Sequence, residues 1–248
     1  MGKILDIFNI LAKQPIYNEY VGLDAMFKKT DYGAYEYDTE SKEFNSICLK
    51  SSYDVIYRQR ENCGIEVKGS QEQISKLKLT ITGKVLYLEQ TDQNLPFDFF
   101  KGLKVYVYSI NIKELTVMGS GNIKVDEHIN NNSYVEIKIF GSGNIYVISC
   151  MCDTALISIN GSGNVSFDRI IAKEKINIQI NGSGNCKLLS VQTHKLENKI
   201  GGSGNIVLKH VNTENTINYI LGSGYIDITG NVSHWTNHKK GSGSININ

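Results

Sequence analysis

The sequence predicts an all-β fold, a right-handed, single-stranded parallel β-helix (β-solenoid) built from coils of about 20 residues. The motif Gly-Ser-Gly occurs seven times, beginning at residues 119, 141, 161, 182, 202, 222 and 241. Apolar and polar residues alternate on both sides of each copy, which is typical of strands with one buried face. Both prolines of the chain, Pro15 and Pro96, precede the repeats, and this suits a ladder that needs every backbone N–H.

The repeated motif is expected to form the corner of each coil. Glycine permits positive φ and lets two backbones approach closely, while Ser and Asn side chains bond to turn backbone groups. Asparagine follows five copies, and these side chains are expected to stack as an amide ladder that ends where Tyr225 and Ser244 replace asparagine. The residues assigned to this structural turn are Gly119, Ser120, Gly121, Asn122, Gly141, Asn144, Gly161, Asn164, Gly182, Asn185, Gly202 and Asn205.

Three apolar columns run through the aligned repeats. The first follows the corner, as at Ile123 and Val125, the second lies in mid-coil, as at Ile170, and the third approaches the next corner, as at Ile157 and Ile159. The β-branched residues that dominate them favour a pleated, half-buried surface. Successive coils should therefore pair in parallel about 4.8 Å apart. A β-propeller blade would need about 40 residues, so the period favours the solenoid.

The chain is expected to divide near residue 43. Residues 44–248 should form the solenoid, with 44–118 as degenerate leading coils and 119–248 as the regular coils. The leading part alternates like strands at 65–69, 76–83 and 103–109 but lacks the turn motif. Residues 1–43 are expected to form a short helix and a tyrosine-rich capping or docking segment, because the first coil of an array needs cover.

Charge and hydropathy exclude several classes of partner. Lys and Arg number 26 against 25 Asp and Glu, a net charge of +1, so no basic excess points to nucleic acid. No stretch approaches the roughly 20 apolar residues that span a membrane. The first residues do not have the pattern of a signal peptide. We therefore expect no nucleic-acid partner and no membrane insertion.

The five cysteines form no recognisable disulfide or zinc framework. Their number is odd, and Cys150 and Cys152 are too close for an ordinary disulfide within a strand. Cys186 takes the slot that Ile or Val fills in other repeats, so it should be a buried hydrophobic side chain. Reduced thiols favour a cytoplasmic location.

Side chains suited to catalysis do not gather in the sequence. Asp126 and Asp168 are expected two coils, or about 10 Å, apart, a separation that an inverting glycosidase pair could use, but ordinary surface charges account for them as well. His234 and His238 flank Trp235 in a segment that is not expected to be helical, and no further metal ligand accompanies them. We expect no catalytic residue, no metal and no other cofactor.

The coil after Tyr225 departs from the repeat and is the candidate interface. Where other coils bring apolar residues toward the corner, this coil has Trp235, Lys239 and Lys240. One interpretation is a terminal coil made polar to protect its edge. The alternative is end-on docking to a second copy or to a partner strand, with Trp235 as the anchor and Tyr225 beside it.

The repeat and the strands that precede it resemble the bacterial auto-transporter adhesin head GIN domain family. The resemblance covers roughly residues 45–247 and includes YDVIYRQ, GIEVKGS and KLKLTITGKVLYLEQ in order. It implies a β-helix, an adhesin and an exported protein, and it carries no defined functional residue.

We therefore expect a non-enzymatic adhesin-like solenoid that presents a rigid surface to a protein or a surface glycan. One alternative is an intracellular scaffold that assembles as a homo-oligomer through the solenoid ends. Another is a glycan-binding or glycan-cleaving β-helix. The location is open between the cytoplasm, which the thiols favour, and the exported location that the resemblance implies.

Overall fold

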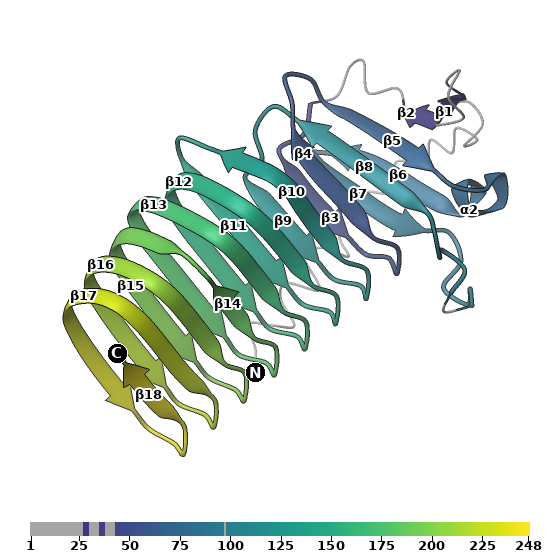
Figure 1. Ribbon diagram of the computed structural model, residues 1–248. Coiled ribbons are helices and arrows are strands. Elements are labelled where there is room, and N and C mark those ends of the chain that lie inside the picture. The colour runs from purple at the N-terminus through teal and green to yellow at the C-terminus, as the bar shows by residue number, and fades with distance from the viewer. Residues whose placement is uncertain (1–26, 30–34, 38–42, 97) are drawn as a thin grey trace.

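The computed structural model describes residues 27–29, 35–37, 43–96 and 98–248, and these form a solenoid. All strands belong to one 18-stranded sheet that winds through about seven turns of about 20 residues. Figure 1 shows the coils stacked along one axis, with their corner loops aligned along one edge. The predicted all-β parallel solenoid is therefore confirmed.

In the regular array, each long strand runs from one corner to the next and bends in mid-coil. Register shifts mark the bend, for example between Cys152 and Thr154. Pairing between successive coils is parallel throughout this part of the sheet. The strands are β9 (Glu114–Val117), β10 (Ile123–Asn130), β11 (Tyr134–Ile139), β12 (Ile145–Ile159), β13 (Val165–Ile180), β14 (Cys186–Leu188), β15 (Val191–Ile200), β16 (Ile206–Ile220), β17 (Tyr225–Lys239) and β18 (Ser244–Ile247).

The predicted apolar columns form the core. Alternate residues of β12 such as Ile145, Val147 and Ile157 are buried, and the register places each above its counterpart in β13. Cys186 is fully buried in the column after the corner, as expected of a small hydrophobic side chain. Because the apolar residues repeat at the height of every coil, one continuous core runs along the axis.

The corner glycines are required for close approach of the backbone. A Cβ atom at Gly143 would overlap the carbonyl oxygen of Gly121 in the preceding coil, and one at Gly163 would overlap that of Gly143. Of the seven motifs, only the last has a glycine at positive φ, Gly241 at 144°. Positive φ was therefore the wrong reason to expect glycine at the other corners, where steric exclusion by the stacked backbone explains it.

A ladder of asparagine side chains runs along the corners. In each rung, the backbone N–H and the side-chain amide of one asparagine donate to the Oδ1 of the asparagine in the preceding coil, at 2.8–3.1 Å. The ladder begins on Asp54, whose carboxylate accepts both groups of Asn122. It ends at Tyr225, whose backbone N–H donates to Asn205. Each rung thus satisfies a corner N–H that would otherwise lack a partner.

Replacing one rung should weaken the array by a measurable amount. In Asn164→Ala, the backbone N–H and amide of Asn185 lose their shared acceptor. Because the site is exposed to water, we expect a loss of about 1–2 kcal/mol in the free energy of unfolding. Urea denaturation measures it, with Ser162→Ala in the same corner as the matched control. Equal stabilities of the two variants would contradict a structural role for the ladder.

The segment before the first Gly-Ser-Gly contains coils that pair in parallel with the array, but it also contains antiparallel strands that the sequence did not indicate. Its strands are β3 (Ser46–Leu49), β4 (Val55–Gln59), β5 (Gly64–Lys68), β6 (Leu77–Thr82), β7 (Val85–Gln90) and β8 (Lys104–Ser109), with one short helix, α2 (Gln71–Ser75). β5 pairs antiparallel with β8, and β6 pairs antiparallel with β7. Antiparallel strands therefore turn the chain back on itself and cover one end of the stack (Figure 1).

The order of the coils in space differs from their order in the chain. β3 pairs in parallel with β7 on one side and with β9 on the other, and β4 lies likewise between β8 and β10. The coil made of β3 and β4 comes first in sequence, but along the stack it lies between the coil made of β7 and β8 and the coil made of β9 and β10. After β8, residues 110–113 pass this inner coil to reach β9.

Two short strands precede the solenoid, β1 (Phe27–Lys29) and β2 (Tyr35–Tyr37). β2 pairs antiparallel with β5, and β1 with β2. The helix expected near the start of the chain lies outside the described residues, so the division at residue 43 stays a prediction. No helix in the described part is long and apolar enough to cross a membrane.

Candidate functional site

The C-terminal end of the stack is only half covered. β18 pairs with β17 from Tyr225 to Ile228, and Gly230 donates its N–H to Asn248 just beyond. Among the described residues, the rest of β17 pairs with β16 alone. The edge of β17 from residue 231 to 239 is therefore open, and Figure 1 shows this strand as the outermost at that end.

The interface residues predicted from the sequence lie in the columns of this last coil. The register places Trp235 over Thr216, and Lys239 over Ile220. Both partners in β16 are buried and point into the core. Trp235 thus occupies an inward position, yet 57% of its surface is exposed because no coil of the described residues covers it. An exposed aromatic side chain in a core column is suited to anchoring a partner.

The other two predicted interface residues lie elsewhere on this end. Tyr225 starts β17 directly after a corner and is exposed, while Lys240 directly precedes the next corner. The structure therefore places Trp235 and Lys239 on the same inward face of β17 and leaves Tyr225 and Lys240 beside the corners. The ring of His238 stacks on that of Tyr219 with centroids 4.6 Å apart, on the outer side of the same strands.

A second amide ladder lies inside the core and ends at this surface. Asn198 donates its side-chain N–H to Asn218, and Asn218 donates to Asn237, each at 2.8 Å. Asn198 and Asn218 are fully buried, and Thr216 also donates to Asn218. The Oδ1 atom of Asn198 is buried without a hydrogen-bond partner. In preceding coils the register places isoleucines, Ile157 and Ile178, at this position.

A small cavity of about 230 Å³ lies beside Trp235. His194 on its wall is 3.1 Å from Glu214, and His234 lies on β17. The remaining lining residues are Lys195, Asn215, Thr216, Ile217 and Thr236.

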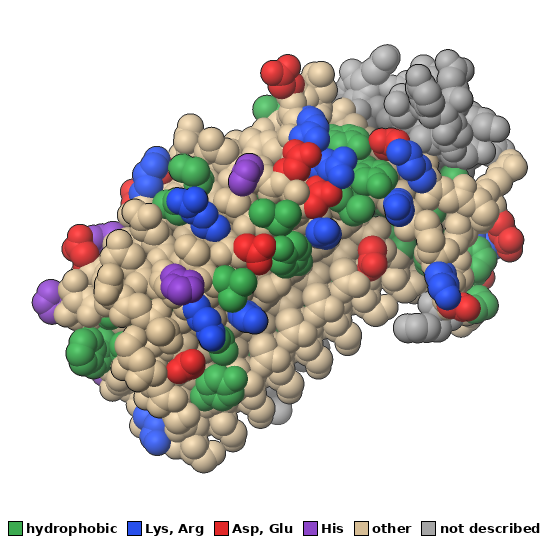
Figure 2. Space-filling view, in the orientation of Figure 1, with side chains coloured by type: hydrophobic (Ala, Val, Ile, Leu, Met, Phe, Trp, Pro, Cys, Tyr) green, Lys and Arg blue, Asp and Glu red, His purple; other side chains and the backbone are tan. Residues whose placement is uncertain are grey.

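The opposite end of the stack carries a patch of arginine and tyrosine that the sequence did not predict. Arg58 binds Asp126 through two bonds of 2.8 and 2.9 Å, and Arg60 binds Glu127 through both of its terminal nitrogens. The guanidinium carbon of Arg58 lies 5.2 Å from the ring centroid of Tyr106. Figure 2 shows basic, acidic and apolar side chains gathered over β4, β8 and β10.

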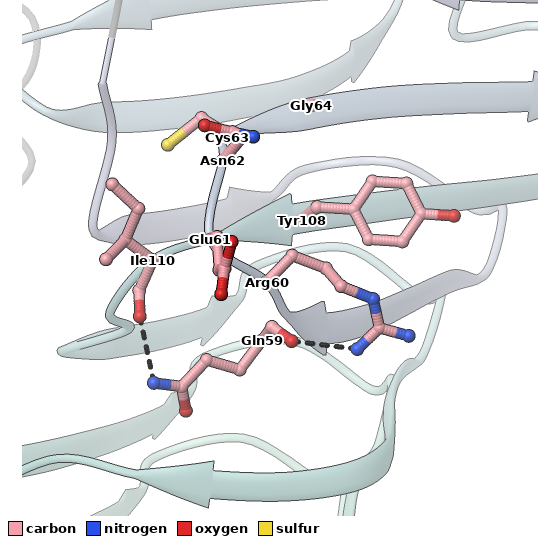
Figure 3. Close-up of a pocket in the computed structure, with 8 residues that line it drawn as sticks. All are labelled: Gln59, Arg60, Glu61, Asn62, Cys63, Gly64, Tyr108 and Ile110. Atoms are coloured by element: carbon pink, nitrogen blue, oxygen red, sulfur yellow. Dashed lines mark hydrogen bonds between the residues drawn. The ribbon is translucent and has the colours of Figure 1, made fainter.

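A wide, open cavity of about 890 Å³ adjoins this patch. In Figure 3 the side chain of Gln59 reaches the carbonyl oxygen of Ile110, and Arg60 donates to the carbonyl oxygen of Gln59, both at 2.8 Å. Tyr108 forms one wall, and burial raises the pKa of its hydroxyl to about 12. The cavity is lined by Gln59, Arg60, Glu61, Asn62, Cys63, Gly64, Tyr108 and Ile110.

The two aspartates considered as a catalytic pair are engaged in separate contacts. The hydrogen bond from Arg58 holds the pKa of Asp126 below its usual range, so this carboxylate is charged and cannot act as a proton donor near neutral pH. Asp168 accepts a hydrogen bond from the hydroxyl of Tyr146. Within the described residues, no group of three or more His, Cys, Asp or Glu side chains is placed to hold a metal ion.

Comparisons with known proteins agree with the resemblance seen in the sequence. The model of the family described as "Putative auto-transporter adhesin, head GIN domain" matches residues 43–169. No curated protein matches the chain.

Solved structures of similar fold cover nearly the whole solenoid. A "putative adhesin" from Bacteroides fragilis is 20% identical with a TM-score of 0.74, covering 87% of this chain and 97% of its own. A "Putative lipid binding protein" from Parabacteroides distasonis is 20% identical with a TM-score of 0.73, covering 87% and 96%. A further "putative adhesin" from that species is 17% identical with a TM-score of 0.68 and the same coverage. With the family model matching more than half of its residues, the chain belongs to the auto-transporter adhesin head GIN domain family.

Proposed function

We propose that this protein is a non-enzymatic, adhesin-like module that binds a partner through the C-terminal end of its solenoid. The observation that carries the proposal is Trp235, an aromatic side chain in a core column that is 57% exposed beside an open strand edge. Buried aromatic anchors account for much of the binding energy at protein interfaces. The continuous core behind it keeps this surface rigid, which lowers the entropy lost on binding.

The family description supports the adhesin part of the proposal. Two of the similar structures are described as adhesins and one as a lipid-binding protein, so the family descriptions point to binding. The partner class that we propose is a protein or a glycan on another surface.

An adhesion assay tests the proposal. Beads coated with the protein are passed over surfaces bearing immobilised fibronectin, mucin or a bacterial polysaccharide panel. We expect retention on at least one surface, reduced at least about tenfold in the variant Trp235→Ala, Lys240→Glu, because both changes fall on the candidate interface.

The matched control is Met151→Ala, Lys124→Glu, which changes an exposed apolar and an exposed basic side chain far from the end. Retention should survive in this control. Absence of retention on every surface, or equal loss in both variants, would contradict the proposed function.

Two alternatives have an observation in their favour. Self-assembly through the half-covered end would make the protein a scaffold, and the molar mass in solution would then rise with concentration. Glycan binding at the arginine–tyrosine patch is favoured by its aromatic rings and by the adjoining cavity. In that case soluble polysaccharide should block retention, and Tyr108→Ala should remove it.

A further inference from the structure

We propose that the C-terminal end binds its partner as an added parallel β-strand, and that it selects a strand with an amide side chain above Asn237 and an acid above Lys239. The inference rests on the proposed function and names the chemistry of the partner. The occupant is an extended polypeptide segment, because three independent features of β17 define what must lie on it.

The first feature is the backbone edge. The earlier long strands of the array pair in parallel with the next coil on both sides of the mid-coil bend, whereas among the described residues β17 beyond Gly230 pairs on one side only. An extended peptide can add to such an edge through backbone hydrogen bonds, while alternate side chains determine specificity. The register of the array identifies the inward positions of β17 that would contact the added strand. These are Trp235, Asn237 and Lys239, which pair with Thr216, Asn218 and Ile220, respectively.

The second feature is the direction of the inner amide ladder. In each rung the side-chain N–H of one asparagine donates to the Oδ1 of the asparagine in the next coil. Asn237 accepts from Asn218 through Oδ1, so the donor end of its amide remains for a group in the following coil. A strand that covers Asn237 with an apolar residue would bury this donor without an acceptor. An amide in the partner continues the ladder.

The third feature is charge. Neither Lys239 nor Lys240 has an ion-pair partner among the described residues, and Lys239 points along the column that is apolar at Ile200 and Ile220. Covering the Lys239 ammonium group removes it from water, which costs free energy unless an acid accompanies it. His234 and His238 on the outer side of β17 add further hydrogen-bond donors. The favoured strand is therefore acidic at its end.

A second copy of this chain fits the same end less well. If the β18 strand of a second copy lay over the open half of β17, it would present Ile245 and Ile247, the inward residues of that strand. Isoleucines above Asn237 and Lys239 would leave the amide donor and the ammonium group without partners. The chemistry of the column thus favours a different strand over self-association.

The probe is a peptide that copies residues 213–221 of this chain, with Ile220→Glu, so that threonine, asparagine and glutamate occupy the three inward positions. Trp235 is the only tryptophan in the chain, so its emission reports on the open end alone. We expect a saturable blue shift of this emission as the peptide covers the indole ring. A peptide that also carries Asn218→Leu should bind at least about tenfold more weakly, because it buries the donor of Asn237.

A charge reversal supplies the second arm. The protein variant Lys239→Glu should prefer the peptide with Ile220→Lys over the peptide with Ile220→Glu, which reverses the order seen with the unaltered protein. Strand addition is overturned by an unchanged emission with every peptide up to about 2 mM, by equal affinity for the asparagine and leucine peptides, or by an unreversed order. A dimer that shows the blue shift without peptide would make the second copy the occupant and also overturn it.

The two proposals can fail separately. If adhesion is lost in the Trp235→Ala, Lys240→Glu variant while no peptide binds, the end is an adhesive surface that does not take a strand. If the peptides bind in the expected order while no surface retains the coated beads, the C-terminal end binds an added strand and the proposed adhesin function is wrong.

Discussion

Gly163→Ala is expected to cost about 3 kcal/mol or more in the free energy of unfolding. The new methyl group would lie well inside 3.0 Å of the carbonyl oxygen of Gly143. No side-chain atom that could move aside lies within that distance, so the clash is with backbone alone. The backbone of Gly143 cannot retreat, because it lies in the same way against Gly121 in the coil before it. Relief would require separating two coils that are hydrogen-bonded on both sides of the corner. Urea denaturation followed by circular dichroism measures the loss.

Gly64→Ala is the matched control for this prediction. A Cβ atom at Gly64 would lie 3.4 Å from a ring carbon of Tyr108, which is an ordinary contact. We expect a change of less than about 1 kcal/mol in this variant. If Gly163→Ala were as stable as Gly64→Ala, the corner glycines would not be required by steric exclusion. A Gly163→Ala protein recovered only as aggregate would support the prediction.

Asn218→Leu is expected to destabilise the protein by about 2–3 kcal/mol, because it removes the central rung of the buried amide ladder. Asn198 would lose the only acceptor for its side-chain N–H, and its Oδ1 already lacks a partner. Thr216, which is 1% exposed, would lose the acceptor for its hydroxyl. Two polar groups would then be buried without partners in a column that elsewhere holds isoleucine. Thermal and urea unfolding measure the effect.

Replacing the three buried polar side chains of this network should restore the stability that the single change loses. The variant Asn198→Ile, Asn218→Ile, Thr216→Val returns these positions to the residue types of the earlier coils. Replacing every partner of a buried network with apolar groups of similar shape is close to neutral or stabilising. A triple variant less stable than Asn218→Leu would show that the ladder contributes stability that isoleucine packing cannot replace.

The coil and its core were predictable because one physical rule repeats in the sequence. A position that stacks on itself every 20 residues must keep its residue type, so Ile157, Ile178 and their counterparts reveal the inward columns directly. The corner asparagines follow the same rule. The start of their ladder on Asp54 does not, because that corner has no Gly-Ser-Gly motif and its place in the stack follows from strand pairing.

The strands before the array were predictable as strands, but the antiparallel pairing of β5 and β6 was not. The alternation of apolar and polar residues along β5 and β6 specifies which face is buried. This alternation does not depend on whether the neighbouring strand is parallel or antiparallel. Only the pairing shows that the chain doubles back there. The arginine–tyrosine patch was missed for a related reason. Arg58 and Tyr106 meet because β4 and β8 are neighbours, and this contact between distant segments has no repeat to reveal it.

The inner amide ladder was hidden because polar residues in an apolar column look like a weakening of the pattern. Asn198 and Asn218 interrupt the isoleucines, and although both they and Asn237 lie four residues before a Gly-Ser-Gly, the sequence does not show that their amides bond to one another. The candidate interface was accessible through Trp235, since it is the only tryptophan and stands where the repeat fails. The place of Trp235 in an inward column agrees with its distance from the last Gly-Ser-Gly, and the register confirms it.

The exchanged order of the first two coils has a mechanical consequence. In a simple stack, a force on the amino end would detach the outermost coil and then each following coil in turn, like a zip. Here β2 is paired with β5, and the next strand, β3, is held between β7 and β9. A load on the amino end therefore falls first on the pairing of β2 with β5 and then as shear across the two ladders of β3. The antiparallel strands β5 and β6 lie beyond β3 at the end of the stack, and they are attached to it through β8 and β7. A module that is pulled through its amino end would therefore resist tension at strands that are paired on both sides rather than at a free edge.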